Sequence, residues 1–189
     1  MQLWVGLGNP GAQYALHRHN VGYMAVDVIA DSWKFDPWKK QFRGQAALGR
    51  IGLERVLLLK PATFMNDSGL SVGEAARFYK LEPGDVTAFH DELDLAPFKV
   101  KVKTGGGAAG HNGLRSIDQH LGQEYRRVRL GIGHPGHKDR VTGYVLGPYA
   151  KAEIDPLAAM LGAVAAEAPR LAAREDARFM SEVALRLQP

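Results

Sequence analysis

The chain has 189 residues, of which 46% are hydrophobic and 23% are charged, and its formal net charge is +4. These proportions are typical of one globular domain. The absence of cysteine excludes disulfides, thiolate nucleophiles, zinc–cysteine sites and iron–sulfur clusters. No apolar run approaches the roughly 18 residues that cross a bilayer, and no basic leader precedes the first apolar run. We therefore expect a soluble cytoplasmic protein with no membrane segment and a single domain over residues 1–189.

The positive charge is concentrated in one stretch of the chain. Residues 97–140 carry nine basic and three acidic side chains, whereas residues 1–96 carry ten and eleven and residues 141–189 carry five and six. A localised basic surface indicates a polyanionic partner. A solvated basic face without a partner would give the same count, so charge alone leaves both interpretations open.

The first half of the chain alternates between predicted strands and helices. Three short apolar runs predict strands buried on both faces, and they lie at residues 3–7, 56–59 and 86–89. Apolar stripes at helical spacing predict one helix that begins near Asn20 and another that follows Asn66. In the second helix, Ser71 and Glu74 have capping-box spacing, and we expect Asp67 to act as its N-cap.

The second half adds two strands of another kind. Residues 98–103 and 127–132 alternate apolar with basic side chains or glycine, which predicts strands with one solvated, basic face. A glycine-rich turn at residues 105–113 lies between them and precedes a helix. From about Ala150 onward the composition predicts one or two helices. The expected fold is α/β, a single domain with a twisted mixed sheet flanked by helices and a C-terminal helical segment.

A dinucleotide site is one interpretation of the glycines after the first strand. Residues 6–11 match G-x-G-x-x-G, and Asp31 follows at a distance suited to a ribose-binding acid. In that motif, however, the helix begins within the glycines, whereas here the apolar stripe begins only at Val21. Asp31 would also end a helix where the motif needs the end of a strand. The dinucleotide interpretation therefore remains only as an alternative.

Other common catalytic signatures are missing. There is no G-x-S-x-G and no H-E-x-x-H, which argues against a serine esterase or a zincin. Gly105 and Gly110 have Walker-loop spacing, but His111 follows where that motif needs lysine. The histidine pairs at 17 and 19 and at 134 and 137, and His90 beside Asp91, lack the spacing of a known metal cage, so we expect no metal.

Polar residues follow the ends of the three buried strands, where α/β sheets gather their ligand sites. Asn9 follows the first strand, Asn66 the second and Asp91 the third. His19, at the mouth of the first helix, is close enough in sequence to return to the same edge. A carboxylate that fixes the tautomer of a histidine supports a general base near neutral pH. A lone histidine is more often structural.

Five ordered motifs resemble the bacterial-type peptidyl-tRNA hydrolase family from the first strand to about residue 150. The motifs, in chain order, are Val5-Gly-Leu-Gly-Asn-Pro-Gly11 with Tyr14 and Arg18-His-Asn-Val-Gly22, then Lys60-Pro61 with Phe64-Met-Asn-Asp-Ser-Gly69, His90-Asp-Glu-Leu-Asp94, Gly105-Gly-Gly107 with Gly110-His-Asn-Gly113, and Arg129-Leu-Gly-Ile-Gly-His-Pro-Gly136. Each motif is weak alone, but five at near-standard spacing are specific.

The resemblance implies a monomeric cytoplasmic enzyme that cleaves the ester between a peptide and the 3′-terminal ribose of tRNA without a cofactor. It implies that His19 is the general base, that Asp91 orients it, and that Asn9 distinguishes N-blocked from free aminoacyl substrates. It places four further residues at the peptide and the 3′ end: Tyr14, Phe64, Asn66 and Asn112. We also expect His111, Lys101 and Lys103 to bind substrate, the lysines through acceptor-arm phosphates.

Two positions depart from the family pattern. Ala108-Ala109 stands where glycine or histidine is expected, and Asp67 stands where many relatives have an uncharged residue. A second class of function also fits the basic stretch, an RNA-binding or nuclease-like domain in which His19 and Asp91 act on a phosphodiester. The products distinguish the two, because the hydrolase leaves tRNA intact and the nuclease shortens it.

Overall fold

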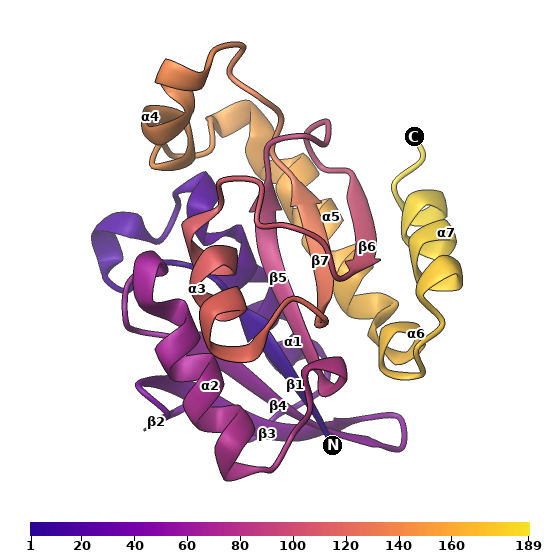
Figure 1. The fold of residues 1–189 in the computed structure, drawn as a ribbon. Coiled ribbons are helices and arrows are strands. Elements are labelled where there is room, and N and C mark those ends of the chain that lie inside the picture. Colours follow the sequence, from indigo (N-terminus) through magenta and orange to yellow (C-terminus); the bar gives the residue numbers. More distant parts are fainter.

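Four parallel strands form the centre of a seven-stranded sheet, and antiparallel strands close both of its edges (Figure 1). The computed structural model describes residues 1–189. The strands are β1 (Gln2–Gly6), β2 (Lys39–Gln41), β3 (Gly44–Ile51), β4 (Glu54–Pro61), β5 (Val86–Glu92), β6 (Val100–Thr104) and β7 (Arg126–Gly131). Their order across the sheet is β2-β3-β4-β1-β5-β7-β6, with β3 antiparallel to β4 and β6 antiparallel to β7. The expected mixed α/β sheet is confirmed.

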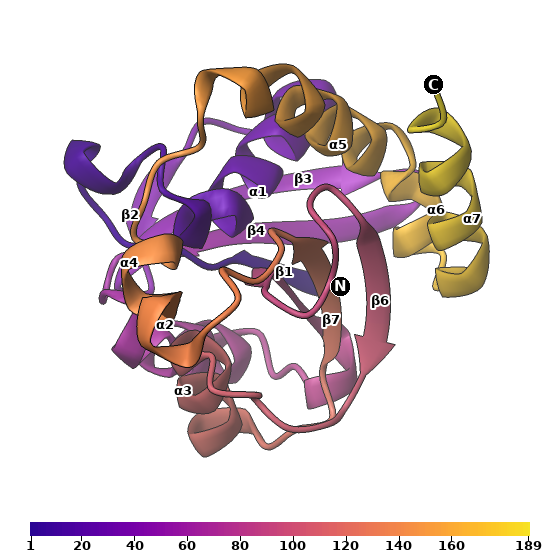
Figure 2. The ribbon, with the colours of Figure 1, turned by 90° about the horizontal axis from the view of Figure 1, so that it is seen from above.

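Helices cover both faces of this sheet (Figure 2). They are α1 (Val21–Ser32), α2 (Ser68–Phe78), α3 (Asn112–Leu121), α4 (Val141–Val145), α5 (Ile154–Ala166), α6 (Ala168–Ala172) and α7 (Asp176–Arg186). Trp4 packs in the core beneath α1 and α5, whereas its neighbours Leu3 and Val5 pack in the core beneath α2 and α3. This alternation places one apolar core on each side of β1. No helix is both long and apolar enough to cross a membrane.

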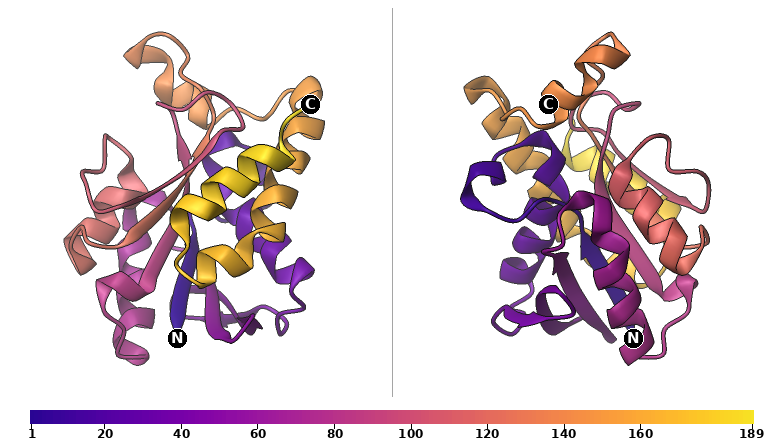
Figure 3. Two further views of the ribbon diagram at one scale, coloured as in Figure 1. Left: turned by 90° about the vertical axis from the view of Figure 1, so that its right-hand side faces the viewer. Right: turned by 60° about the vertical axis from the view of Figure 1, so that its left-hand side comes forward.

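The C-terminal segment forms three helices where we expected one or two (Figure 3). Pro169 lies in the first turn of α6 and cannot donate the backbone hydrogen bond that would continue α5. α7 then packs beside β6, where Phe179 and Val183 are buried and Met180 lies against Val102. The segment therefore covers the β6 edge of the sheet.

The sequence did not predict β2 and β3, and it ended β5 too early. β3 carries Gly44, Ala46, Ala47 and Gly49, which give no apolar–polar alternation, although they pair with β4 along its length. β5 continues from the apolar run to Glu92, so Asp91 lies within the strand and pairs with Leu130 rather than following the strand end.

The expectation of a solvated basic face is confirmed for β6 and wrong for β7. Lys101 and Lys103 are exposed, whereas Arg127 is 2% exposed and the side chain of Arg129 is only 26% exposed and is paired with Glu92. The glycine-rich turn folds back over β7, and its carbonyls at Gly106 and Gly107 accept hydrogen bonds of 2.6 and 2.7 Å from Arg127. Part of the basic excess is therefore buried and hydrogen-bonded within the fold.

The expected capping of α2 is also wrong in its details. Asp67 occupies the N-cap position, but its side chain accepts no hydrogen bond from the helix. Ser71 lies inside the helix, and its hydroxyl donates to the carbonyl of Phe42 in the neighbouring loop. The Ser71 hydroxyl, which the capping-box spacing assigned to the start of the helix, therefore makes a tertiary hydrogen bond instead.

Candidate active site

A cavity of about 940 Å³ opens beyond the carboxyl ends of β1 and β5. Eight of the ten residues predicted for the site line it: Asn9, His19, Phe64, Asn66, Asp91, Lys103, His111 and Asn112. Tyr14 does not line the cavity, but its ring lies edge-on to Phe64 with 6.3 Å between centroids. Lys101 lies outside it on β6, directly opposite Arg129, which does line the cavity.

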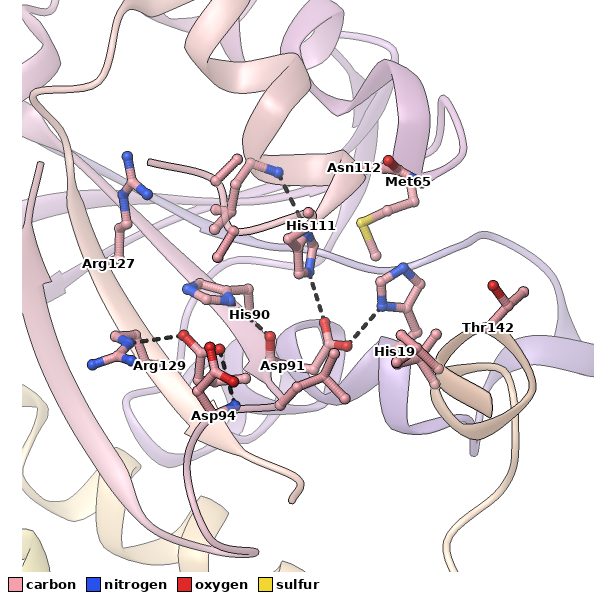
Figure 4. A pocket seen from close by; sticks show the side chains of 18 of the residues that line it. His19, Met65, His90, Asp91, Asp94, His111, Asn112, Arg127, Arg129 and Thr142 are labelled. Carbon is pink, nitrogen blue, oxygen red and sulfur yellow. Dashed lines mark hydrogen bonds and ion pairs between the residues drawn. The ribbon is translucent and has the colours of Figure 1, made fainter. Parts of the chain in front are cut away.

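Asp91 lies between two histidines at the centre of the cavity wall (Figure 4). Its Oδ2 is 2.8 Å from Nδ1 of His19, and its Oδ1 is 2.8 Å from Nε2 of His111. The Asp91 side chain is 2% exposed, and the two imidazoles are 12% and 10% exposed. The sequence predicted the first pair, whereas it gave no sign that His111 would bind the same carboxylate.

The hydrogen bonds fix the tautomers of both rings. Nδ1 of His111 accepts from the backbone amides of Gly113 and Leu114, at 3.1 and 3.3 Å, so its proton lies on Nε2 and is donated to Asp91. An ionised Asp91 is acceptor-only, so Nδ1 of His19 donates to it. Nε2 of His19 therefore carries the lone pair, and His19 lines the cavity.

Burial and charge act in opposite directions on these groups. Burial alone would lower the pKa of His19, but the charge of Asp91 and its hydrogen bond outweigh burial and raise it. Burial would raise the pKa of Asp91, whereas His111 and His19 hold that pKa well below its ordinary value. The pair is thus an ionised carboxylate beside an imidazole of raised basicity, which suits a general base.

A close approach between α1 and the sheet brings His19 to Asp91. A Cβ at Gly22 would lie 2.2 Å from the carbonyl oxygen of Phe89, so only glycine allows the start of α1 to pack against β5. Arg18 anchors the other side of the turn, donating to the carbonyl of Pro148 at 3.0 Å and to Glu153 at 2.9 Å. The histidine is therefore held from both sides.

Asn9 and the turn before α2 form the wall opposite the basic residues. Oδ1 of Asn9 accepts from the backbone amide of Met65 at 2.7 Å, which directs Nδ2 as the free donor of the side chain. Phe64 lines the cavity with a φ of 61°, in the left-handed region that bulky residues rarely adopt, and the residue is 54% exposed. A strained, exposed aromatic residue at a cavity is typical of a ligand contact.

Basic side chains line the other part of the cavity, toward β6 and β7 (Figure 4). They are Lys103 on β6 and Arg127 and Arg129 on β7, and Lys138 lines the cavity from the turn before α4. Arg129 is paired with Glu92 at 2.9 Å, and the guanidinium of Arg127 donates to loop carbonyls. Lys103 and Lys138 therefore supply most of the unpaired positive charge of the cavity lining.

His90 also lines the cavity and was not singled out as a base by the sequence. Its Nδ1 lies 2.8 Å from the backbone carbonyl of Asp91, and its ring lies edge-on to His111 at 5.2 Å. Burial, followed by the neighbouring His111, lowers the pKa of His90 to about 4. His90 is therefore neutral at physiological pH, and it is a weaker base than His19, whose pKa is raised.

The cluster could also supply ligands to a metal ion, because one atom each from His19, Asp91 and His111 lie within 4.8 Å of one another. The other predicted histidine candidates, His17 and the pair near residue 134, take no part in this cluster. Both nitrogen–oxygen distances, however, are those of hydrogen bonds, and one assignment of protons accounts for all three groups.

The glycines after β1 do not form a dinucleotide site. α1 begins only at Val21, so its first amides do not face the G-x-G-x-x-G turn, and Asp31 lies at the last turn of α1.

His111 occupies the N-cap position of α3. A polar side chain just before a predicted helix was the one signal in the sequence that could have shown this residue to be held in place.

An α/β fold with a carboxylate-oriented imidazole in an asparagine-lined cavity has the groups that a hydrolase needs to activate water and to bind an amide-containing substrate. The family model described as peptidyl-tRNA hydrolase matches residues 3–188. The chain is 77% identical over 187 residues to the peptidyl-tRNA hydrolase of Rhizorhabdus wittichii, covering 99% of each chain, and 69% identical over 188 residues to that of Erythrobacter litoralis, covering 100% of each. The crystal structure of the Acinetobacter baumannii peptidyl-tRNA hydrolase superposes with a TM-score of 0.91 at 40% identity, over 97% of this chain and 94% of that one. The chain belongs to the peptidyl-tRNA hydrolase family.

Proposed function

We propose that the protein hydrolyses the ester that joins a peptide, or an N-blocked amino acid, to the 3′-terminal ribose of tRNA. The observation that carries this proposal is the free Nε2 of His19, oriented by Asp91 inside a cavity that is basic at one end. Family membership identifies the ester as the bond to be cleaved. We also propose that the enzyme acts as a monomer in the cytoplasm.

His19 would act as the general base for water. Nε2 takes a proton from water as the water oxygen attacks the ester carbonyl. The imidazolium of His19 then returns that proton to the ribose oxygen as the tetrahedral intermediate collapses, which releases the peptide carboxylic acid and the free 3′-hydroxyl and restores the neutral imidazole. Asp91 stabilises the imidazolium that forms, and His111 holds the second carboxylate oxygen. An ester is reactive enough for a water molecule activated by a general base to hydrolyse it directly, so the proposed mechanism has no covalent intermediate.

The asparagines would recognise the peptide through its backbone. Asn9, Asn66 and Asn112 line the cavity and carry amide groups that donate and accept hydrogen bonds. Peptide backbone presents the same groups whatever the sequence, so such a site accepts many peptides. Tyr14 and Phe64 would add apolar contact at the same end.

The basic residues would bind phosphates of the acceptor arm. Lys101 and Lys103 are exposed on β6, and Lys138 lies at the cavity. Contacts to phosphate supply affinity without base specificity, as an enzyme acting on many tRNAs needs. No cofactor is part of this proposal.

The test is the release of an N-acetylated amino acid from charged tRNA, with the tRNA length followed on a denaturing gel. Free N-acetyl amino acid and intact tRNA would support the hydrolase. A shortened RNA would instead support the nuclease-like alternative. Activity that persists in EDTA would show that the reaction needs no divalent ion.

A further inference from the structure

Asn20 is a buried asparagine that follows His19 directly in the chain. Its side chain does not cap the helix at whose start it lies. It stands at the N-cap of α1, where asparagine commonly accepts a hydrogen bond from the first turn, yet it caps no amide of that helix. The residue is 2% exposed. A buried amide turned away from its own helix must be satisfied elsewhere.

Both ends of the Asn20 side chain bind the backbone of Asn9. Oδ1 accepts from the amide of Asn9 at 2.9 Å, and Nδ2 donates to the carbonyl of Asn9 at 2.9 Å. Asn9 has four polar groups: its backbone amide, its backbone carbonyl, Oδ1 and Nδ2. Because Oδ1 accepts from the Met65 amide, the first three all have partners within the protein. Pro10 further restricts the Asn9 backbone, because the residue before proline avoids the helical region.

The result is an Asn9 whose one free polar group, Nδ2, has a fixed position in the cavity wall. The Met65 bond also prevents the amide from turning over, because an amide nitrogen in place of Oδ1 would face another donor. A donor at this position pairs with a carbonyl and opposes an ammonium group. A donor that could swing by about 1 Å would lose much of this discrimination.

We propose that Asn20 is a positioning residue that sets the preference for N-blocked substrates by clamping the backbone of Asn9. The inference rests on the proposed function, since it needs Asn9 to distinguish an acylated amine from a free one. Asn20 does not line the cavity, whereas Asn9 does, so Asn20 acts only through Asn9.

The test is a double-mutant cycle with Asn20→Asp and Asn9→Ala, read as the ratio of kcat/KM on N-acetylaminoacyl-tRNA to kcat/KM on free aminoacyl-tRNA. Asn20→Asp keeps the shape and the acceptor but replaces the donor by an oxygen that repels the Asn9 carbonyl. The ratio should fall about two- to tenfold, which is the effect of one ordinary hydrogen bond. In the double variant the ratio should equal that of Asn9→Ala alone, because a clamp without its target has no further effect.

Ser71→Ala is the matched control. Ser71 is equally buried and bonds a backbone carbonyl, that of Phe42, outside the cavity, so the ratio should not change. If the charge of Asn20→Asp prevents folding, the uncharged Asn20→Ser carries the same prediction. Proportional losses on both substrates, with an unchanged ratio, would overturn the clamp and make Asn20 a purely structural residue. A wild-type protein inactive on N-acetylaminoacyl-tRNA would instead overturn the proposed function itself.

Discussion

Nδ1 of His19 lies 2.8 Å from Oδ2 of Asp91, and this contact joins the turn that precedes α1 to the end of β5. The other carboxylate oxygen is held by His111, whose own tautomer is fixed by the first amides of α3. Three elements distant in sequence thus determine which nitrogen of His19 is free. The proton pattern of the site follows from the fold rather than from the histidine alone.

The pH dependence of hydrolysis should reflect the raised pKa of His19. The general base must be unprotonated, so kcat/KM should rise with pH through a midpoint above the ordinary histidine value of 6.5. Asp91→Asn removes the negative charge that raises the pKa of His19, and burial then lowers that pKa without opposition. The midpoint should therefore shift downward, and the maximal rate should fall. A pH series with uncatalysed ester hydrolysis subtracted measures both. An unshifted midpoint in Asp91→Asn would contradict the assigned role of the carboxylate.

Asn9→Ala or Asn9→Asp should weaken the distinction between N-blocked and free aminoacyl-tRNA. The first change removes the Nδ2 donor, and the second replaces it by an acceptor that attracts an ammonium group. Rates on the two substrates give the ratio, and circular dichroism confirms the fold. Should the ratio stay at the wild-type value in both folded variants, Asn9 has no part in the selectivity.

Lys101→Ala combined with Lys103→Ala should weaken binding of full-length substrate and leave the chemical step nearly unchanged. For every phosphate that the variant no longer binds, the slope of log affinity against log salt should flatten by roughly 0.7–0.9. KM should therefore rise most at low salt, while a minimal substrate lacking the acceptor arm should be almost unaffected.

The control for this pair is Lys39→Ala with Lys40→Ala, which removes two equally exposed charges at the opposite edge of the sheet. The same change in salt slope for both pairs would show that net charge, and not the β6 surface, sets the affinity. A loss of turnover in the β6 pair without a change in slope would also exclude the phosphate role.

Arg126→Met should destabilise the fold without entering the chemistry. The buried guanidinium of Arg126 donates to Thr87, to the carbonyl of Leu171 and to Asp176, each within 3 Å, and so ties β7 to the C-terminal helices. Hydrogen bonds to a charged group contribute about 1.5–3 kcal/mol each. Asp176 is one third exposed, so we count only the two buried bonds, to Thr87 and Leu171, and expect a loss of about 3–6 kcal/mol in the free energy of unfolding. Urea denaturation measures this loss, and Arg178→Met on the exposed face of α7 should change it little.

The sequence predicted those parts of the fold in which local pattern and burial agree. The apolar runs of β1, β4 and β5 predicted three buried strands at the centre of the sheet. The helical stripe predicted a helix start near Asn20, within one residue of the observed start of α1 at Val21. We did not predict β3 because its glycines and alanines show no alternation of apolar and polar residues. The strand is held by its backbone pairing with β4. Arg127 was assigned to solvent because nothing local shows that Gly106 and Gly107 fold back onto it.

The same limit applies to the site. His19 and Asp91 could be paired in advance because strand ends and a helix start meet at one sheet edge. The second partner of Asp91 could not, since His111 reaches it only through the path of the glycine-rich turn. Asn20 was visible only as a helix start, and its contacts with Asn9 depend on the close packing at Gly22.

The role of His19 as general base is tested by a single-turnover comparison of wild type and His19→Ala on N-acetylaminoacyl-tRNA, with tRNA binding measured in parallel. We expect the wild type to release N-acetyl amino acid and intact tRNA. For His19→Ala we expect a loss of roughly 10²–10⁴ in rate, with tRNA affinity within a few-fold of wild type. Near-wild-type hydrolysis by folded His19→Ala would contradict the proposed mechanism.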